Sequence, residues 1–146
     1  MKKEVLAAEN VQLGVDPESK NEAIERVGNL LVSRGYVNKN YIDGMKAREE
    51  EVTTYMGNGV AIPHGMNEYK KEIMNSGIVI AQYPSGVDFG SGNTAYVVIG
   101  IAGRGDEHME ILSKIALTIQ YEENVEKLRK AETAEEVISI INEGEM

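Results

Sequence analysis

The chain contains two histidines, and both lie beside glycine-containing turns at the ends of expected elements. His64 follows an apolar segment and sits between Pro63, which fixes its own φ angle, and the permissive Gly65. His108 follows the glycine-rich turn at residues 103–105. A neutral imidazole is a competent nucleophile, because its ordinary pKa of about 6.5 leaves one ring nitrogen with a free lone pair near neutral pH. These positions therefore favour histidine chemistry at a strand end, with His64 presented outward.

Attack of His64 on a phosphoryl group is one reaction that such a site would support. Negative charge then spreads over the equatorial oxygens of the phosphoryl group and needs nearby cations or hydrogen-bond donors. Arg48, His108 and the amides of the turns are the candidates. From the residues alone, Arg48 is read more simply as a solvated cation near a helix C-terminus.

Sites for metals and nucleotides fit the sequence less well. His64 and His108 with Asp106 or Glu107 lack the short ligand spacing of known metal motifs. The glycines within residues 100–105 match neither the dinucleotide fingerprint nor the phosphate-binding loop that ends in lysine and serine or threonine. We therefore expect no metal and no cofactor.

Two further functional classes stay open at this stage. In a hydrolase, His64 would act as a general base, with His108 and Arg48 stabilising an oxyanion. No serine or cysteine nucleophile motif accompanies them. In the other class, the chain is an interaction domain without chemistry.

Composition indicates an ordinary globular protein. The 146 residues suit one domain spanning residues 1–146, with 42% hydrophobic and 27% charged residues. The chain has no cysteine, which excludes disulfides and thiol chemistry and favours the cytoplasm. The net charge of −9 argues against nucleic acid or anionic lipid as a partner.

Export and membrane insertion are not expected. The first residues begin like a signal peptide, but Glu4 and Glu9 interrupt the apolar stretch. No run approaches the roughly 20 apolar residues that cross a bilayer.

The elements that must position these residues can be read from periodicity and capping signals. Ser19 and Glu22 have the spacing of a capping box before a helix that runs to Gly35. A second helix is expected from about Lys39 to Glu49, with Asn38 as its cap, ending near Arg48.

Two later helices follow the same logic. Apolar residues between 109 and 119 predict a long helix capped by Asp106, which places His108 in its first turn. Thr133 and Glu136 form a second capping box before a C-terminal helix. The seven methionines are read most simply as core residues, with a few exposed ones suited to an adaptable partner surface.

Strand signals alternate with these helices. Residues 52–55 and 60–62 predict short strands around a turn at residues 57–59. Residues 77–83, ending at Pro84, and residues 95–102 are almost continuously apolar, which is typical of central strands covered on both faces. The order predicts an α/β layered domain with helices on both faces of a sheet.

The segment Gly-Val-Ala-Ile-Pro-His-Gly at residues 59–65, preceded by Thr-Tyr-Met-Gly at 54–57, resembles the phosphorylation motif of the mannitol/fructose enzyme IIA family of the sugar phosphotransferase system. The likeness covers essentially the whole chain. Its other segments are residues 9–14, 41–45 with Arg48 and Glu49, 82–87 with Phe89 and Gly90, and 98–102 through His108.

The resemblance implies that His64 receives phosphate from phosphorylated HPr and donates it to a cysteine of a IIB component of the mannitol IIB/IIC permease. It also implies that His108 and Arg48 lie around the phosphate, and that the fold is a mixed five-stranded sheet flanked by helices. The segment at residues 82–84 favours a mannitol-type member. A fructose-type IIA, or a regulatory IIA whose phosphorylation switches partner binding, is the alternative.

One local conflict accompanies this interpretation. Asp106 and Glu107 lie beside His108, and their carboxylates would repel a phosphate unless they point away from it. We therefore expect both side chains to face solvent.

Overall fold

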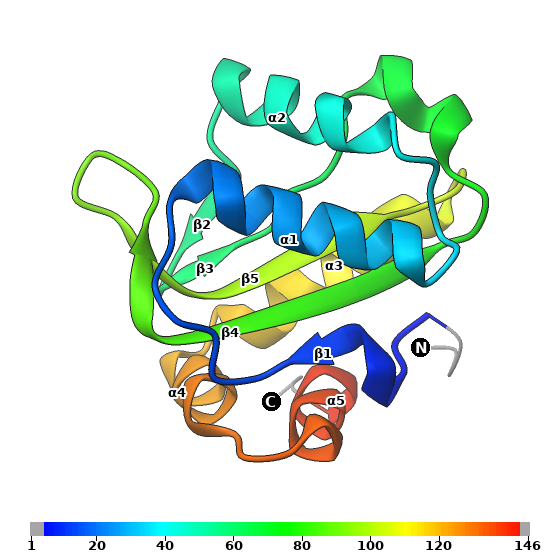
Figure 1. Ribbon diagram of the computed structural model, residues 1–146. Coiled ribbons are helices and arrows are strands. Elements are labelled where there is room, and N and C mark those ends of the chain that lie inside the picture. The colour runs from blue at the N-terminus through cyan, green and yellow to red at the C-terminus, as the bar shows by residue number, and fades with distance from the viewer. Residues whose placement is uncertain (1–4, 144–146) are drawn as a thin grey trace.

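The computed structural model describes residues 5–143, apart from the side chains of Asn67 and Glu143. The reading of Glu4 as an interruption of a signal-like segment lies outside these residues. The described chain forms a mixed five-stranded sheet with helices on both faces, as Figure 1 shows. This confirms the fold class expected from the sequence.

The elements are as follows. The strands are β1 (Val11–Gln12), β2 (Tyr55–Gly57), β3 (Val60–Ala61), β4 (Gly77–Asp88) and β5 (Thr94–Ala102). The α-helices are α1 (Lys20–Ser33), α2 (Tyr41–Glu51), α3 (Glu107–Ile119), α4 (Glu122–Lys130) and α5 (Ala134–Glu143). Two short 3₁₀ helices, η1 (Ala8–Asn10) and η2 (Asn67–Glu72), precede β1 and β4 respectively.

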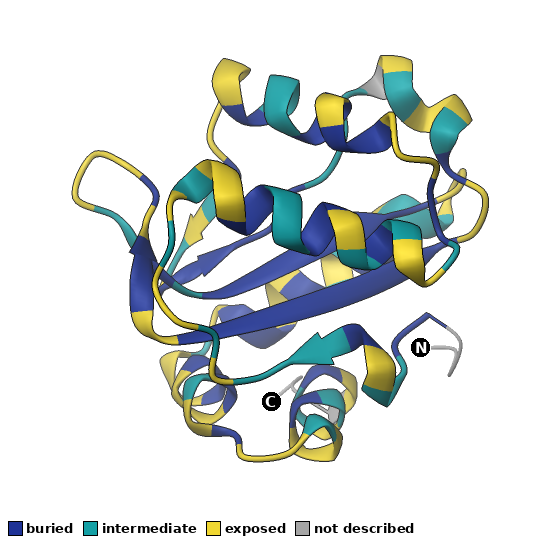
Figure 2. Cartoon of the chain, viewed as in Figure 1, coloured by how far each residue is buried: buried dark blue, intermediate teal, exposed yellow. Residues whose placement is uncertain are grey.

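Strands β4 and β5 occupy the centre of the sheet. The strand order is β1-β4-β5-β3-β2, with β4 and β5 antiparallel and with β1 and β3 parallel to their respective neighbours β4 and β5. Most residues of these two strands are buried, as the dark ribbons of Figure 2 show. Because helices cover both faces, the two strands are apolar along almost their whole length.

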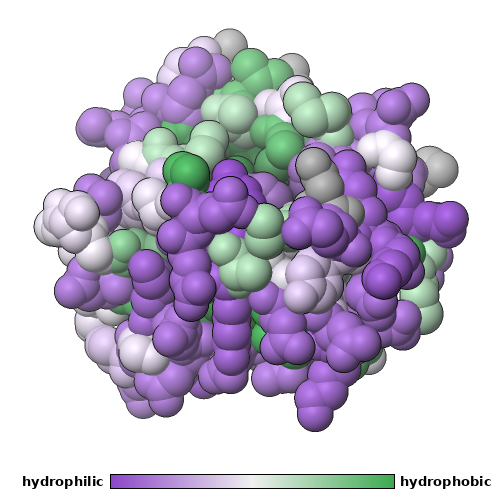
Figure 3. All heavy atoms as spheres, turned by 90° about the horizontal axis from the view of Figure 1, so that it is seen from above, coloured by the Kyte–Doolittle hydropathy of each residue, from purple (hydrophilic) through white to green (hydrophobic). Residues whose placement is uncertain are grey.

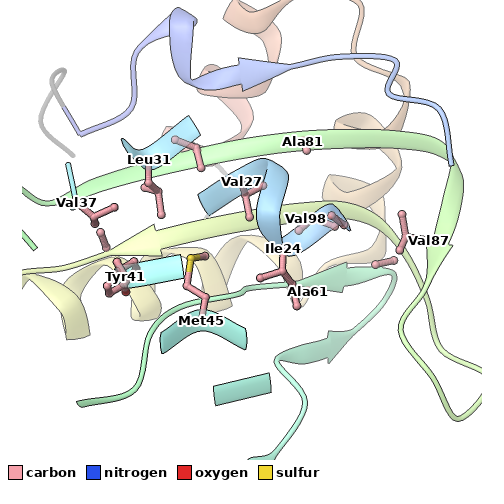
Figure 4. Close-up of a cluster of buried hydrophobic side chains, with 14 of the residues drawn as sticks. Ile24, Val27, Leu31, Val37, Tyr41, Met45, Ala61, Ala81, Val87 and Val98 are labelled. Carbon is pink, nitrogen blue, oxygen red and sulfur yellow. The ribbon is translucent and has the colours of Figure 1, made fainter. Parts of the chain in front are cut away.

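Each face of the sheet has its own core. On the upper face of Figure 1, α1 and α2 pack Ile24, Val27 and Met45 towards Ala81 and Val98, as the close-up in Figure 4 shows. On the other face, helices α3, α4 and α5 cover a second core. Its buried members include Ile78, Ile80, Val97, Ile99, Ile101, Ile111, Ile115, Leu128 and Ile141.

The capping predictions succeed in part. Ser19 forms the full capping box with Glu22 at the start of α1. Thr133 accepts from the Glu136 N–H, whereas the Glu136 carboxylate accepts from the N–H of Glu132 rather than from that of Thr133. Asp106 occupies the N-cap position of α3 but makes no capping hydrogen bond through its side chain.

The second helix differs from its prediction. It runs from Tyr41 to Glu51, two residues later than expected at both ends. Asn38 does not cap it, because its carboxamide donates to Glu72 while its backbone carbonyl accepts from the Tyr41 N–H. Val52 is then the exposed C-cap of α2 and not the first residue of a strand.

Two further strand and side-chain predictions need correction. Pro84 does not end the first central strand, which continues to Asp88 through a register shift between Gln82 and Val87. The methionines are not uniformly core residues, since Met45 is fully buried whereas Met56, Met74 and Met109 are exposed.

No helix within residues 5–143 is both long enough and apolar enough to cross a membrane.

Candidate functional site

The three residues singled out by the sequence line one open cleft of about 370 Å³. Its lining comes from the end of α2, the segment after β3, the start of η2 and the first turn of α3. The lining residues are Arg48, Glu51, His64, Gly65, Met66, Glu68 and His108. Residues that are distant in the sequence are therefore brought together beyond the C-terminal ends of β3 and β5.

The backbone of His64 is held by the neighbouring central strand. Beyond β3 the chain continues parallel to β5, so that His64 pairs with Ile101 and the Ile101 N–H donates to the Pro63 carbonyl over 3.0 Å. Pro63 has no N–H to leave unsatisfied here, and it ends the regular ladder without a lost hydrogen bond.

The His64 ring has a defined hydrogen-bonding pattern. Its Nδ1 lies 2.7 Å from the carbonyl oxygen of Ile62. A carbonyl only accepts, so Nδ1 carries the proton and donates it to this bond. Nε2 is then the nitrogen with a free lone pair in the neutral ring. Nε2 is therefore the ring nitrogen that is available to attack an incoming group.

Burial lowers the pKa of His64 below its usual value of 6.5. The hydrogen bond to Ile62 opposes this effect, the positive charge of Arg48 adds to it, and the negative charge of Glu49 opposes it. Desolvation is the largest cause, because it disfavours the charged imidazolium. The neutral, nucleophilic form of His64 is thereby favoured at neutral pH.

His108 also lines the cleft, and it lies in the first turn of α3 as the sequence predicts. The ring centroids of His64 and His108 are 5.6 Å apart, with the ring planes tilted by 58°. Burial lowers the pKa of His108, and the nearby His64 and Lys70 lower it further. A neutral His108 has one N–H with which to donate to a group placed between the two rings.

Gly103 permits this close approach of α3. A Cβ added at Gly103 would lie 2.4 Å from the Cα of His108, a contact that real Cβ atoms do not make. Only glycine allows the end of β5 and the start of α3 to come so close.

Arg48 lies in the last turn of α2 and supplies a positive charge to the cleft. Its Nη1 donates to the carbonyl of Val52, the C-cap of the same helix. This bond is the helix-end interaction expected from the residue alone. The same side chain also borders the cleft that contains His64, so the two readings of Arg48 are compatible.

The carboxylates near the cleft are not those that the sequence suggested. Asp106 is exposed as expected, but Glu107 is half-buried and accepts a hydrogen bond from the Ser76 hydroxyl over 2.7 Å. Neither lines the cleft, whereas Glu51 and Glu68 do. Glu51 and Glu68 were not foreseen, because nothing in their local sequence marks them as neighbours of His64.

Within residues 5–143, no group of three or more His, Asp or Glu side chains is placed to hold a metal ion. The cleft has two imidazoles, one guanidinium and two exposed carboxylates at its border. This set suits the transient binding of an anionic group beside a nucleophilic nitrogen.

Comparison with known families gives one match over nearly the whole chain. Residues 4–144 match the family described as "Phosphoenolpyruvate-dependent sugar phosphotransferase system, EIIA 2".

Relatives with high sequence identity carry one name. The chain is 51% identical over 140 residues to the mannitol-specific phosphotransferase enzyme IIA component of Bacillus subtilis (strain 168), covering 96% of this chain and 98% of that protein. It is 52% identical over 139 residues to the protein of the same name from Geobacillus stearothermophilus, covering 95% and 96%.

Solved structures from Escherichia coli share the fold. The enzyme IIA in a complex of mannitol enzyme IIA with phosphorylated enzyme IIB superposes with a TM-score of 0.89 at 36% identity, covering 94% of this chain and 97% of that one. The crystal structure of the mannitol IIA gives a TM-score of 0.86 at 38% identity, covering 93% and 98%.

Proposed function

The chain belongs to the EIIA 2 family of the phosphoenolpyruvate-dependent sugar phosphotransferase system, and we propose that it carries a phosphoryl group on Nε2 of His64. The observation that carries this assignment is the bond between His64 Nδ1 and the Ile62 carbonyl. It fixes one tautomer and leaves the Nε2 lone pair for a phosphorus atom.

The proposed reaction has two displacements. In the first, the Nε2 lone pair attacks the phosphorus of a phosphorylated donor histidine, and the P–N bond of the donor breaks with its electron pair returning to the donor imidazole. In the second, a thiolate of the acceptor attacks the phosphorus, and the electron pair of the Nε2–P bond returns to His64. No external base is needed for the first step, because Nε2 is already unprotonated.

Arg48 and His108 stabilise the transferring group in this proposal. Both line the cleft with His64, and both offer N–H donors to the equatorial oxygens. The stabilisation has to be moderate, because a carrier must release the group it accepts. Glu51 and Glu68 at the border of the cleft limit the net attraction for a dianion.

The partners and the sugar follow from the family and from the names of the relatives. We infer that phosphorylated HPr is the donor and that a cysteine of a mannitol-type IIB, belonging to a IIB/IIC permease, is the acceptor. The relatives at about half identity are named mannitol-specific, which supports mannitol over fructose. The protein would act in the cytoplasm as a single domain spanning residues 1–146.

The direct test is phosphorylation of the purified protein by phosphoenolpyruvate, enzyme I and HPr. Intact mass is expected to rise by one acid-labile phosphoryl group in the wild type and to stay unchanged in His64→Ala. Two-dimensional NMR of the phosphorylated protein should assign the phosphorus to Nε2. No mass gain in the wild type would refute the proposal and favour the hydrolase or binding-domain readings.

The sugar is tested separately. Phosphorylated protein is mixed in turn with membranes that contain a mannitol permease and with membranes that contain a fructose permease, and the labelled sugar phosphate is counted. Mannitol phosphate should form at least ten times faster than fructose phosphate. Faster formation of fructose phosphate would leave the phosphocarrier assignment in place and would contradict the assignment of mannitol as the sugar.

A further inference from the structure

We infer that Tyr41 is a positioning residue for the proposed phosphoryl transfer, because it ties the segment that carries His64 to the end of strand β5. The inference rests on the proposed function of His64. Tyr41 does not line the cleft, and it acts through the backbone on either side of it.

The hydroxyl of Tyr41 bridges two chain segments. It donates to the Ile101 carbonyl over 2.9 Å and accepts from the Gly65 N–H over 2.8 Å. Tyr41 is the first residue of α2 and only 1% exposed, so water cannot readily replace either bond. Burial raises the pKa of Tyr41 to about 12, which keeps the hydroxyl protonated and able to donate.

These two bonds complete a closed arrangement around His64. Ile101 already donates its N–H to the Pro63 carbonyl, on the N-terminal side of His64. Tyr41 then links the Ile101 carbonyl to the Gly65 N–H, on the C-terminal side. The peptide groups flanking His64 are therefore both fixed to one residue of the central sheet.

The tyrosine ring adds a steric constraint. A Cβ at Gly65 would lie 2.5 Å from the Tyr41 ring, so the ring packs directly against the backbone after His64. The direct neighbour of the nucleophile is thus held by a hydrogen bond and by contact. Ile101 is also one residue before the end of β5, from which the chain leads to His108. Tyr41 consequently links the two histidine-bearing segments through the sheet.

The test is Tyr41→Phe, with Tyr36→Phe as the matched control. Tyr36 is also a buried tyrosine of the same core. Its hydroxyl accepts from the Asn10 side chain, and neither Tyr36 nor Asn10 lines the cleft. Both substitutions keep the ring and remove one buried hydroxyl. A loss that merely reflects stability should therefore appear in both variants.

Two readouts separate positioning from stability. At saturating phosphodonor, the phosphorylation rate of Tyr41→Phe is expected to fall between about 10- and 100-fold, with KM changed less than threefold, because misplacement of a reacting atom by about 1 Å has effects of this size. The ¹⁵N imidazole spectrum of unphosphorylated His64 should lose its single Nδ1–H tautomer signature. Tyr36→Phe should match the wild type in both.

Failure of the positioning role of Tyr41 can be distinguished from failure of the proposed function of His64. Failure of wild-type phosphorylation would remove the proposed function itself. A normal wild type, with Tyr41→Phe equal to Tyr36→Phe in rate and in the His64 spectrum, would overturn the positioning role alone. If Tyr41→Phe does not fold, Gly65→Ala offers a second route to displace the same contact, and the same two readouts decide.

Discussion

At the scale of single residues, His64 and His108 share one electrostatic problem. Each ring is partly buried, and burial lowers the pKa of both. Two imidazolium groups with centroids 5.6 Å apart would also repel each other. The pair is therefore mostly neutral before phosphorylation, and a phosphoryl dianion on His64 would reverse the sign of the field at His108.

An NMR titration of the ring ¹H–¹⁵N signals tests this pair. Both titration midpoints are expected below 6.5, because desolvation favours the neutral rings. His64 should therefore keep its free lone pair at pH 6.5 and lose it only when the pH falls below its own lowered midpoint. After phosphorylation the midpoint of His108 should move upward. His64→Gln assigns the signals, and a His64 midpoint above 6.5 in the free protein would contradict the argument.

Arg48 gives a second prediction at this scale. Arg48→Gln keeps a hydrogen-bond donor near Val52 but removes the charge beside the cleft. The phosphorylation rate is expected to fall about 100-fold, as for the loss of one preorganised stabilising group, with stability changed by no more than about 1 kcal/mol. Stopped-flow or quench kinetics and thermal unfolding measure the two quantities.

Arg129→Gln is the control for Arg48. Arg129 lies on α4, where its guanidinium stacks 3.8 Å from the centre of the Tyr96 ring and donates to Pro84. The substitution Arg129→Gln should leave the phosphorylation rate unchanged. An equal slowing by both substitutions would mean that overall charge matters and that the position of Arg48 does not.

At the scale of elements, helix α2 supports the site from both of its ends. Tyr41 begins it, and the buried Glu49 lies near its end. The Glu49 carboxylate accepts from the N–H and hydroxyl of Thr54 and from the hydroxyl of Thr53. The Thr54 carbonyl in turn accepts from the Ile62 N–H, and Ile62 holds the His64 ring. The turn from α2 into β2 is therefore fixed by one side chain.

Glu49→Ala is expected to reduce the free energy of unfolding by about 3 kcal/mol, because it leaves the Thr54 N–H and two hydroxyls without their buried acceptor. Urea unfolding followed by circular dichroism measures the loss. Glu25→Ala is the control, since Glu25 pairs with Lys46 at the surface, where such pairs contribute at most about 1 kcal/mol. Equal losses in the two variants would show that the Thr53–Thr54 contacts contribute little.

The elements differ in how far the sequence could predict them. The capping box at Ser19 is local, and it was confirmed. The start of α2 was misplaced because Asn38 and Asn40 are both plausible caps, and neither caps the helix with its side chain. The strand β4 was ended too early because its pairing with β5 resumes past Pro84 after a register shift between Gln82 and Val87, which a pattern of apolar residues does not reveal.

The site, like the elements, could be predicted only in part. His64, His108 and Arg48 could be singled out by their side-chain chemistry and by the family resemblance of the segments around them. The structure places all three around one cleft. The roles of these residues stay predictions. Tyr41 was not predicted as a site residue, because its hydrogen-bond partners, Gly65 and Ile101, are 24 and 60 residues away in sequence. Glu51 and Glu68 come near His64 only through the packing of α2 and η2.

At the scale of the whole molecule, the surface and the core have different characters. Hydrophilic residues cover much of the face formed by α1 and α2, with apolar residues gathered towards one edge, as Figure 3 shows. The net charge of −9 accords with this polar surface. Exposed Val52 and Met109 are the sequence neighbours of Glu51 and His108, which line the cleft, so the surroundings of the cleft also offer apolar contact area to a visiting protein.

The core raises the question of whether its two halves unfold together. Strands β4 and β5 belong to both halves, because neighbouring residues such as Val98 and Ile99 face opposite sides of the sheet. If the sheet unfolds, the helices on both of its faces lose the strand side chains against which they pack. We therefore expect one cooperative transition, as for most single domains of this size.

Tyrosines and isoleucines report on the two halves separately. Tyr36, Tyr41 and Tyr83 belong to the core beneath α1 and α2, and Tyr55 and Tyr69 pack against it. Most buried isoleucines lie in the other half: Ile62, Ile78, Ile80, Ile99, Ile101, Ile111, Ile115, Ile119 and Ile141. Near-ultraviolet circular dichroism of tyrosine and methyl NMR of isoleucine should therefore give coincident urea midpoints.

Substitutions on opposite faces of β5 make this test stringent. Ile99→Val removes one methyl group from the isoleucine-rich half and should cost about 1 kcal/mol, and Val98→Ala removes two from the other half and should cost about 2 kcal/mol. Each is expected to move the tyrosine and the isoleucine midpoints by the same amount. If Ile99→Val moved only the isoleucine transition, the two faces of the sheet would be separate cooperative units, and the cleft, which depends on elements from both faces, could open without unfolding of the tyrosine-rich half.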